Sequence, residues 1–201
     1  EMLDLSHKMF NKAVKKSKKQ ENLTVLKKLK NRDREINSYQ REVRRKIFTH
    51  FAIEQGTHDI TSLMVLVMMI VDIERIGDYS KNILDLAINY PDALDTKHLH
   101  KDLYDIEIEV KERFDHTIDA VKTQDIRDAG NLLKGFKKHV TGASDRIVNN
   151  IIAGNLEFQS GSEAAAIALY ARYLKRIGSH LKNITTTIVN PIDAIGYRPK
   201  K

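Results

Sequence analysis

Two stretches of this sequence repeat the same pattern, and that repetition limits the folds open to the chain more than any other feature. Residues 73–83 read Ile-Glu-Arg-Ile-Gly-Asp-Tyr-Ser-Lys-Asn-Ile, and residues 174–184 read Leu-Lys-Arg-Ile-Gly-Ser-His-Leu-Lys-Asn-Ile. Upstream, apolar residues also correspond, at a spacing of 104 instead of 101 positions: Phe10 with Phe114, Val14 with Ile118, Ile36 with Val140, Val43 with Ile147, and Ile47 with Ile151. The sequence therefore predicts a duplicated structural unit.

Apolar residues recur at helical spacing in both halves, with charged residues between them. This pattern, with 6% aromatic residues and three prolines, favours an all-α protein over a sheet protein. We expect two tandem three-helix bundles, over residues 1–90 and 98–190, followed by a tail over 191–201. The predicted helices are Met2–Lys19, Leu23–Gln55 and Asp59 to just before Pro91, then His98–Thr123, Asp125–Ala153 and Ser160–Val189, with Pro91–Lys97 as a linker.

The third predicted helix contains the most apolar part of the chain. Nine apolar residues run without interruption over Leu63–Val71. Because this half of the helix has no polar face, we expect other helices to enclose it. Val67, Val71, Ile83 and Leu84 are predicted to be largely buried.

Each copy of the repeated motif places a glycine inside a predicted helix, at Gly77 and Gly178. Glycine in a helix interior costs about 1 kcal/mol relative to alanine. Close approach of a neighbouring helix would explain both residues.

Composition excludes several classes of site. The chain has no cysteine, so disulfides, thiolate metal sites and cysteine nucleophiles are excluded, and a reducing compartment is compatible. No nucleophile elbow, Gly-rich phosphate loop or HExxH motif occurs, so nothing in the sequence supports catalysis. No segment reaches the roughly 20 apolar residues that span a bilayer. The sequence begins with Glu1, so a membrane segment in a longer chain stays compatible with it.

The formal net charge of +7 is concentrated near the start of the chain. Such a surface suits nucleic acid, anionic lipid or an acidic protein partner. Nucleic acid is disfavoured, because no recognised reading motif appears and acidic residues alternate with the basic ones. A solvated basic face is the simplest interpretation. The two clusters are Lys15, Lys16, Lys18 and Lys19, and then Lys27, Lys28, Lys30, Arg32, Arg34, Arg41, Arg44, Arg45 and Lys46.

Two carboxylates, Glu74 and Asp78, stand one helical turn apart on the same face. Like charges at this spacing repel by roughly 0.2–0.5 kcal/mol. A bound cation would remove that cost, since paired carboxylates suit hard, oxygen-preferring metals. The spacing alone more often marks a solvated acidic strip or ion pairs with basic side chains of a neighbouring helix, and both interpretations stay open at this point.

The residues around this pair resemble the signature of the PhoU family. Asp72-Ile-Glu-Arg-Ile-Gly-Asp78-Tyr-Ser-Lys-Asn82-Ile fills nearly every position of a family pattern close to D-L-E-R-I-G-D-x-x-x-N-I. The resemblance implies an all-helical, internally duplicated phosphate-uptake regulator. The second copy of the motif extends it over essentially the whole chain.

In PhoU-like proteins the motif carboxylates, with an acidic residue on the preceding helix, hold metal ions, often iron or zinc. The resemblance therefore makes Glu74 and Asp78 metal ligands in the first repeat. On the preceding helix the family's D-x-x-x-D pattern falls on Asp33 and Asn37, so an amide replaces one carboxylate and weakens the expected site. An oxygen-only shell points to iron, zinc, manganese or magnesium.

The second repeat departs from the family pattern. Lys175 stands where the family has Glu, Ser179 where it has Asp, and Lys137 is expected to face them from the fifth helix. A protonated ammonium cannot bind a metal, so we expect a metal in the first repeat only. These three residues could instead bind an anion or a partner's carboxylates, or be surface residues that drifted after loss of the site.

The resemblance implies a non-enzymatic regulator in the cytoplasm, peripheral to the inner face of the cell membrane. It would connect a phosphate transporter with a membrane sensor kinase and repress phosphate-starvation signalling when phosphate is plentiful. Two alternatives stay open. One is the cytosolic domain of a sodium–phosphate cotransporter, and the other is a metal-dependent hydrolase, although no base or nucleophile stands beside the carboxylates. The long basic helices permit a homodimer.

Overall fold

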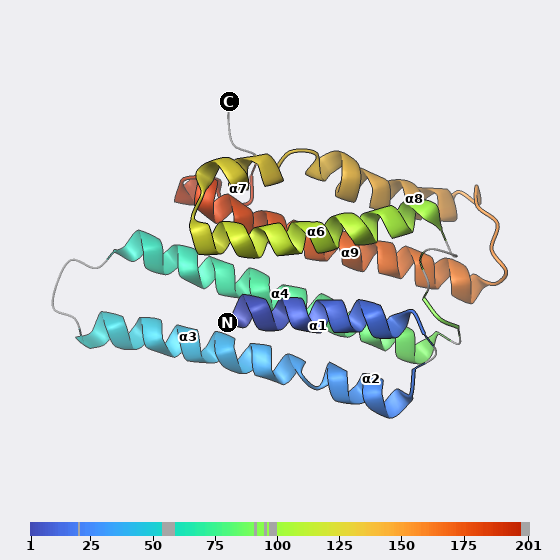
Figure 1. Ribbon diagram of the computed structural model, residues 1–201, viewed down its shortest axis with the longest axis horizontal. Helices are drawn as coiled ribbons and strands as arrows, with labels where there is room; N and C mark the ends of the chain where they lie inside the picture. Colours follow the sequence, from blue (N-terminus) through green and yellow to red (C-terminus); the bar gives the residue numbers. More distant parts are fainter. Residues whose placement is uncertain (20, 54–58, 91, 95, 97–99, 198–201) are drawn as a thin grey trace.

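The computed structural model describes residues 1–19, 21–53, 59–90, 92–94, 96 and 100–197, and all regular structure within these ranges is helical (Figure 1). The predicted all-α fold is confirmed. None of the described helices is long and apolar enough to cross a membrane. In chain order the elements are α1 (Met2–Ser17), α2 (Leu23–Lys30), α3 (Asp33–Ile53), α4 (Ile60–Asn89), α6 (Lys101–Thr123), α7 (Ile126–Leu132), the π-helical η1 (Lys137–Gly142), α8 (Ala143–Ile152), α9 (Gly161–Val189) and the 3₁₀ turn η2 (Ile192–Ala194).

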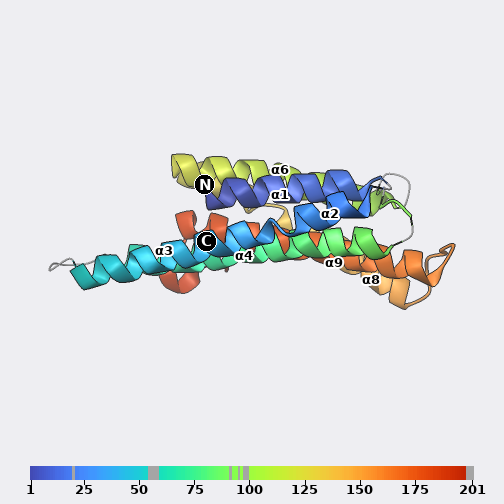
Figure 2. The same cartoon turned by 90° about the horizontal axis from the view of Figure 1, so that it is seen from below.

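Two long helices, α4 and α9, pack against each other at the centre of the molecule. α1 lies on α4 and α6 lies on α9, both on the same side, so that α1 and α6 form one layer (Figure 2). α3 runs along the outer edge of α4, and α8 along the outer edge of α9 (Figure 1). Each half of the chain thus supplies one complete set of helices to a shared bundle.

The two repeats are related by an approximate two-fold axis. Phe10 stacks on its repeat equivalent Phe114 with ring centroids 5.7 Å apart, and Tyr79 stacks on its equivalent His180 at 5.8 Å. Contact between equivalent residues is what a two-fold interface produces. One cluster of buried apolar side chains extends through both repeats, from Met2 to Ile184.

The two motif glycines make equivalent contacts, as their repetition predicts. A Cβ atom on Gly77 would lie 2.8 Å from the Cδ1 of Ile36, and one on Gly178 would lie 3.1 Å from the Cγ1 of Val140. Ile36 and Val140 are themselves repeat equivalents. The glycines therefore let α3 approach α4, and η1 approach α9, more closely than any larger residue would allow.

Two long helices predicted from the spacing are wrong, because each is broken near its start. The predicted helix from Leu23 to Gln55 divides at a turn over residues 31–32 between α2 and α3, and its last two residues lie outside the described residues. The predicted helix Asp125–Ala153 divides after α7, where Gly135 adopts a left-handed φ of +72°. Helical periodicity continues across both breaks, so apolar spacing does not reveal them.

The prediction that other helices enclose Leu63–Val71 is also wrong. Val67 and Val71 are only half-buried and Met64 is 53% exposed, whereas Ile83 and Leu84 are fully buried as predicted. The reason is length: the α3–α4 hairpin projects beyond the ends of α1 and α9 (Figure 1), so α4 is covered on fewer sides there. An apolar run predicts that a helix has no polar face, but it does not predict how many neighbouring helices extend far enough to cover it.

The predicted linker and tail are anchored to the bundle. Leu94 is buried and its backbone N–H donates to the carbonyl of Ser17 at 2.8 Å. In the tail, Ile195 is buried but Tyr197 is 71% exposed, so only part of the tail packs on the bundle.

Beside the connection between the repeats lies a fully buried carboxylate, Glu107 of α6. Its Oε1 lies 2.7 Å from the ammonium of Lys18 and 2.6 Å from that of Lys111. Its Oε2 accepts hydrogen bonds from the hydroxyls of Thr96 at 3.1 Å and Tyr170 at 3.0 Å. This one side chain therefore connects the end of α1 in repeat one, the connection and two helices of repeat two.

Candidate functional site

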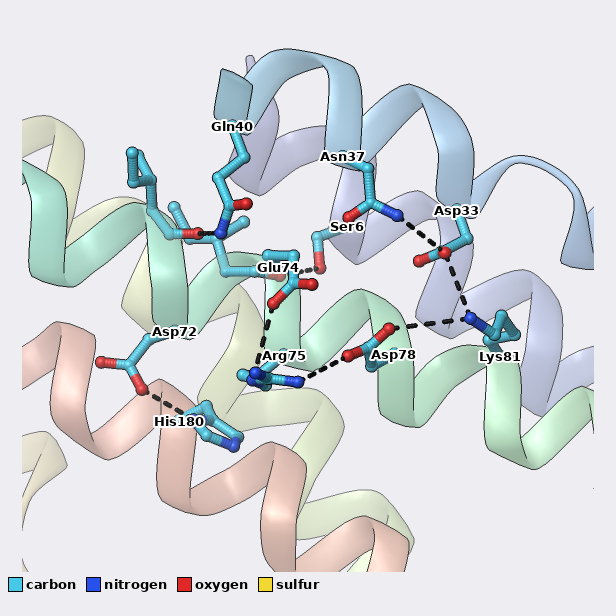
Figure 3. A network of polar contacts seen from close by, with 12 residues as sticks. Ser6, Asp33, Asn37, Gln40, Asp72, Glu74, Arg75, Asp78, Lys81 and His180 are labelled. Atoms are coloured by element: carbon cyan, nitrogen blue, oxygen red, sulfur yellow. Dashed lines mark hydrogen bonds and ion pairs between the residues drawn. The ribbon is translucent and has the colours of Figure 1, made fainter. Parts of the chain in front are cut away.

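The acidic pair and the residues predicted to face it come together between α3 and α4 (Figure 3). Glu74 and Asp78 lie one turn apart on α4, and Asp33 and Asn37 lie one turn apart at the start of α3. Asp33 is only 5% exposed, because Gly77 lets α3 approach α4 at this level. The four candidate residues thus occupy one surface region.

Lys81 of α4 bridges the two helices. Its ammonium lies 3.3 Å from the Oδ2 of Asp33 and 3.7 Å from the Oδ1 of Asp78. The amide of Asn37 donates to the same Asp33 oxygen at 3.0 Å. Burial tends to lower the pKa of Lys81, but the charges of Asp33 and Asp78 outweigh it and raise this pKa.

Arg75 neutralises the outer side of the cluster. Its guanidinium lies 3.0 Å from the Oδ2 of Asp78 and 3.6 Å from the Oε2 of Glu74. Glu74 and Asp78 therefore do pair with basic side chains, and both of these cations, Arg75 and Lys81, come from α4 itself. Arg44 of the neighbouring α3 acts on Glu74 through its charge alone.

Two carboxyl groups of the cluster, those of Glu74 and Asp33, are incompletely compensated by their neighbours. Burial raises the pKa of Glu74, and the charges of Asp78 and Asp33 raise it further, against the opposing effect of Arg75. The Oδ1 of Asp33 is buried and has no hydrogen-bond partner among the described residues. A buried carboxylate oxygen without a donor is costly, so both features favour a positive group at this position.

As a metal site, the cluster has suitable donors but an open arrangement. All its donors are carboxylate or amide oxygens, which hard cations prefer. Among the described residues, however, no three His, Asp or Glu side chains converge closely enough to hold a metal ion. Lys81 instead lies between Asp33 and Asp78.

Comparison with known proteins finds a family model that matches this region. The family model of the PhoU domain matches residues 1–87, which include all of α1–α3 and the acidic cluster. The first repeat is therefore similar in sequence to the PhoU domain. The crystal structure of PhoU from Pseudomonas aeruginosa matches 93% of this chain and 90% of that chain, with a TM-score of 0.72 and 21% sequence identity, so the whole chain has the PhoU fold. Among curated proteins, no sequence match is found.

The second repeat, which the PhoU domain match does not include, presents a different surface at the equivalent place. Lys175 lies 2.6 Å from the Oδ1 of Asp145 on α8, and Arg172 lies 3.2 Å from the same atom. The hydroxyl of Ser179 donates to the carbonyl of Lys175 in its own helix, and Lys137 is exposed at the start of η1. Their binding of an anion or a partner's carboxylate stays a prediction.

Sequence reasoning missed a polar contact between the first repeat and the second. The Nδ1 of His180 lies 2.6 Å from the Oδ1 of Asp72, and the amide of Asn183 donates to the same oxygen at 3.0 Å. By the repeat spacing, this Asp72–His180 pair is the counterpart of Tyr173 and Tyr79, whose rings lie 6.1 Å apart. Asp72 lies directly before the repeated motif, and its partner becomes apparent only from the two-fold arrangement of the repeats.

Replacing Glu74 with glutamine is expected to stabilise the metal-free protein by about 0.2–0.5 kcal/mol at pH 7, because it removes a like-charge pair. The pKa of Glu74 is raised above 4.5 in the folded state, so proton binding favours folding. That contribution is fully present below pH 4.5 and is lost as the pH rises through the folded-state pKa. The difference between variant and parent should therefore appear above that pKa and disappear at pH 4. Urea unfolding at pH 4 and pH 7, with a chelator present, measures it.

Proposed function

We propose that this chain is a PhoU-type regulator of phosphate uptake that acts through partner proteins and not through catalysis. It would act in the cytoplasm at the inner face of the membrane, between a phosphate transporter and a sensor kinase. The observation that carries the proposal is the match of residues 1–87 to the PhoU domain. The PhoU fold over nearly the whole chain supports it.

An exposed apolar surface also supports a role in binding partners. At the projecting end of the α3–α4 hairpin, Phe48 is 75% exposed, Ile53 is 71% exposed and Met64 is 53% exposed. Large apolar side chains gathered at one end of a protein are typical of interaction surfaces.

Deleting the gene in its host, with a phosphate-starvation promoter fused to a reporter, tests the proposal. We expect the reporter to become active in phosphate-rich medium and to be silenced again when the full-length gene is restored. Normal repression in the deletion strain would contradict the proposal. Loss of sodium-dependent phosphate uptake with repression intact would instead identify a cotransporter domain, and metal-dependent phosphatase activity of the purified protein would identify a hydrolase.

We further propose that Glu74, Asp78 and Asp33, with the amide of Asn37, hold one divalent or iron-type cation in the first repeat. The unpartnered Oδ1 of Asp33 and the raised pKa of Glu74 support this proposal. The cation would replace the ammonium of Lys81 between Asp33 and Asp78. Because a lysine already supplies charge there and Asn37 supplies none, binding should be weak. A bound cation would fix α3 against α4.

A further inference from the structure

Five of the seven residues that line a groove between α1 and α2 carry cationic side chains. It has a volume of about 460 Å³, and most of its surface is apolar, with Val25 and Leu29 among the residues that line it. This volume lies within the roughly 300–1,000 Å³ of small-molecule sites. The charged residues that line it are Lys12, Lys15, Lys16, Lys28 and Arg32.

Most of this positive charge is not neutralised within the protein. Lys16 pairs with Glu21, and Arg32 pairs with Glu35 at 3.1 Å. The other three cations, Lys12, Lys15 and Lys28, form no ion pair with any described residue.

The cations in the groove also repel one another. Lys12 lies three and four residues before Lys15 and Lys16 on α1. Like charges at these spacings on one helix destabilise it. A ligand with several negative charges would relieve this repulsion.

The second repeat supplies an internal comparison, because it has a groove at the equivalent position. That groove lies between α6 and α7, has a volume of about 480 Å³, and is lined by His116, Asp119, Asp128 and Asn131 among others. At the repeat spacing of 104, His116 replaces Lys12 and Asp119 replaces Lys15. The fold therefore produces the groove, but the cationic lining is a property of the first repeat alone.

We propose that the α1–α2 groove binds a ligand carrying two or more linked or adjacent phosphate groups. Lysine binds phosphate as a mobile point charge, and several flexible ammoniums can converge on one compact anion. A small groove with five cations calls for dense negative charge, which an oligophosphate supplies better than the spaced carboxylates of an acidic helix. The same chemistry is found in free oligophosphates and in phosphorylated lipid headgroups. The proposal does not depend on the proposed regulatory function.

Calorimetric titration of the full chain with inorganic tripolyphosphate, at fixed ionic strength, tests this site. The groove variant K12Q/K15Q/K28Q should bind at least about tenfold more weakly than the parent, since it removes the three unpaired cations. The matched control K8Q/K27Q/K101Q loses the same net charge from exposed lysines outside the groove and should bind within about twofold of the parent. Thermal unfolding of both variants confirms that they fold.

The same variants distinguish the sources of the phosphate. If vesicles containing phosphatidylinositol bisphosphate bind more tightly than tripolyphosphate, with the same loss in the groove variant only, the site is supported and its ligand is a lipid headgroup. If both variants bound the phosphate probes equally weakly, the loss of binding would come from the lower net charge and not from the groove, and the proposal would be overturned. Failure of both probes to bind, or groove-dependent binding of a single-stranded oligonucleotide alone, would also overturn it.

Discussion

Replacing Glu107 with alanine is expected to lower the free energy of unfolding by about 3–5 kcal/mol, the range measured when one partner of a buried ion pair is removed. The Glu107 side chain is fully buried, and it accepts from four donors. In the variant, Lys18 and Lys111 can turn toward water, since their side chains are 24% and 29% exposed. The hydroxyls of Thr96 and Tyr170 cannot, and each buried group without a partner costs about 1–3 kcal/mol.

Urea denaturation followed by circular dichroism measures this loss. Tyr170→Phe removes one hydrogen bond and should cost only about 0.5–1.5 kcal/mol. Glu42→Ala, which breaks an exposed ion pair with Lys46, is the control and should not measurably change the midpoint. If the Glu107 and Glu42 variants unfolded at the same urea concentration, the buried network would not stabilise the fold as argued.

Saturating metal is expected to raise the thermal midpoint of the parent protein and to have no effect on the Glu74→Ala/Asp78→Ala variant. At a metal concentration 100 times the dissociation constant, the stabilisation is about 2.7 kcal/mol, whatever the affinity. Both substitutions remove carboxylates that face Asp33 and Asn37, so the remaining donors carry one charge. Thermal unfolding with and without Mn²⁺, Zn²⁺, Mg²⁺ or Fe²⁺ measures the effect, and elemental analysis gives the stoichiometry.

Ser179→Ala is the matched control for the metal-binding experiment, because Ser179 is the second-repeat equivalent of Asp78. There, Lys175 pairs with Asp145. It should leave the metal-dependent rise intact. Two equivalent sites per chain, or a rise that persists in the double alanine variant, would rule out a single site in the first repeat.

Repetition in the sequence predicted those parts of the fold that depend on local pattern. The equivalence of Gly77 and Gly178 predicted two close helix approaches, and both occur, against Ile36 and Val140. The family pattern also predicted that Glu74 and Asp78 face residues 33 and 37, and the four residues do lie together. In each case the prediction came from a short sequence motif, which either recurs in the chain or follows a family pattern.

Features that depend on distant partners could not be predicted in this way. The exposure of Met64 depends on where neighbouring helices end, which no property of an apolar run encodes. The ammonium of Lys81 between Asp33 and Asp78 depends on the side-chain positions of two helices. The contact between Asp72 and His180 requires knowing how the repeats face each other, because 108 positions separate the two residues.

The approximate two-fold axis between the repeats has a further consequence for how such a chain can change over time. An interface in which Phe10 meets Phe114 is self-complementary, like that of a symmetric dimer. In a dimer of identical subunits, every substitution appears twice and both halves change together. Fusion into a single chain removes that constraint while keeping the shared interior. One half can then keep carboxylates at positions 74 and 78 while the other acquires Lys175 and Ser179. Covalent linkage thus lets a symmetric scaffold carry two chemically different surfaces.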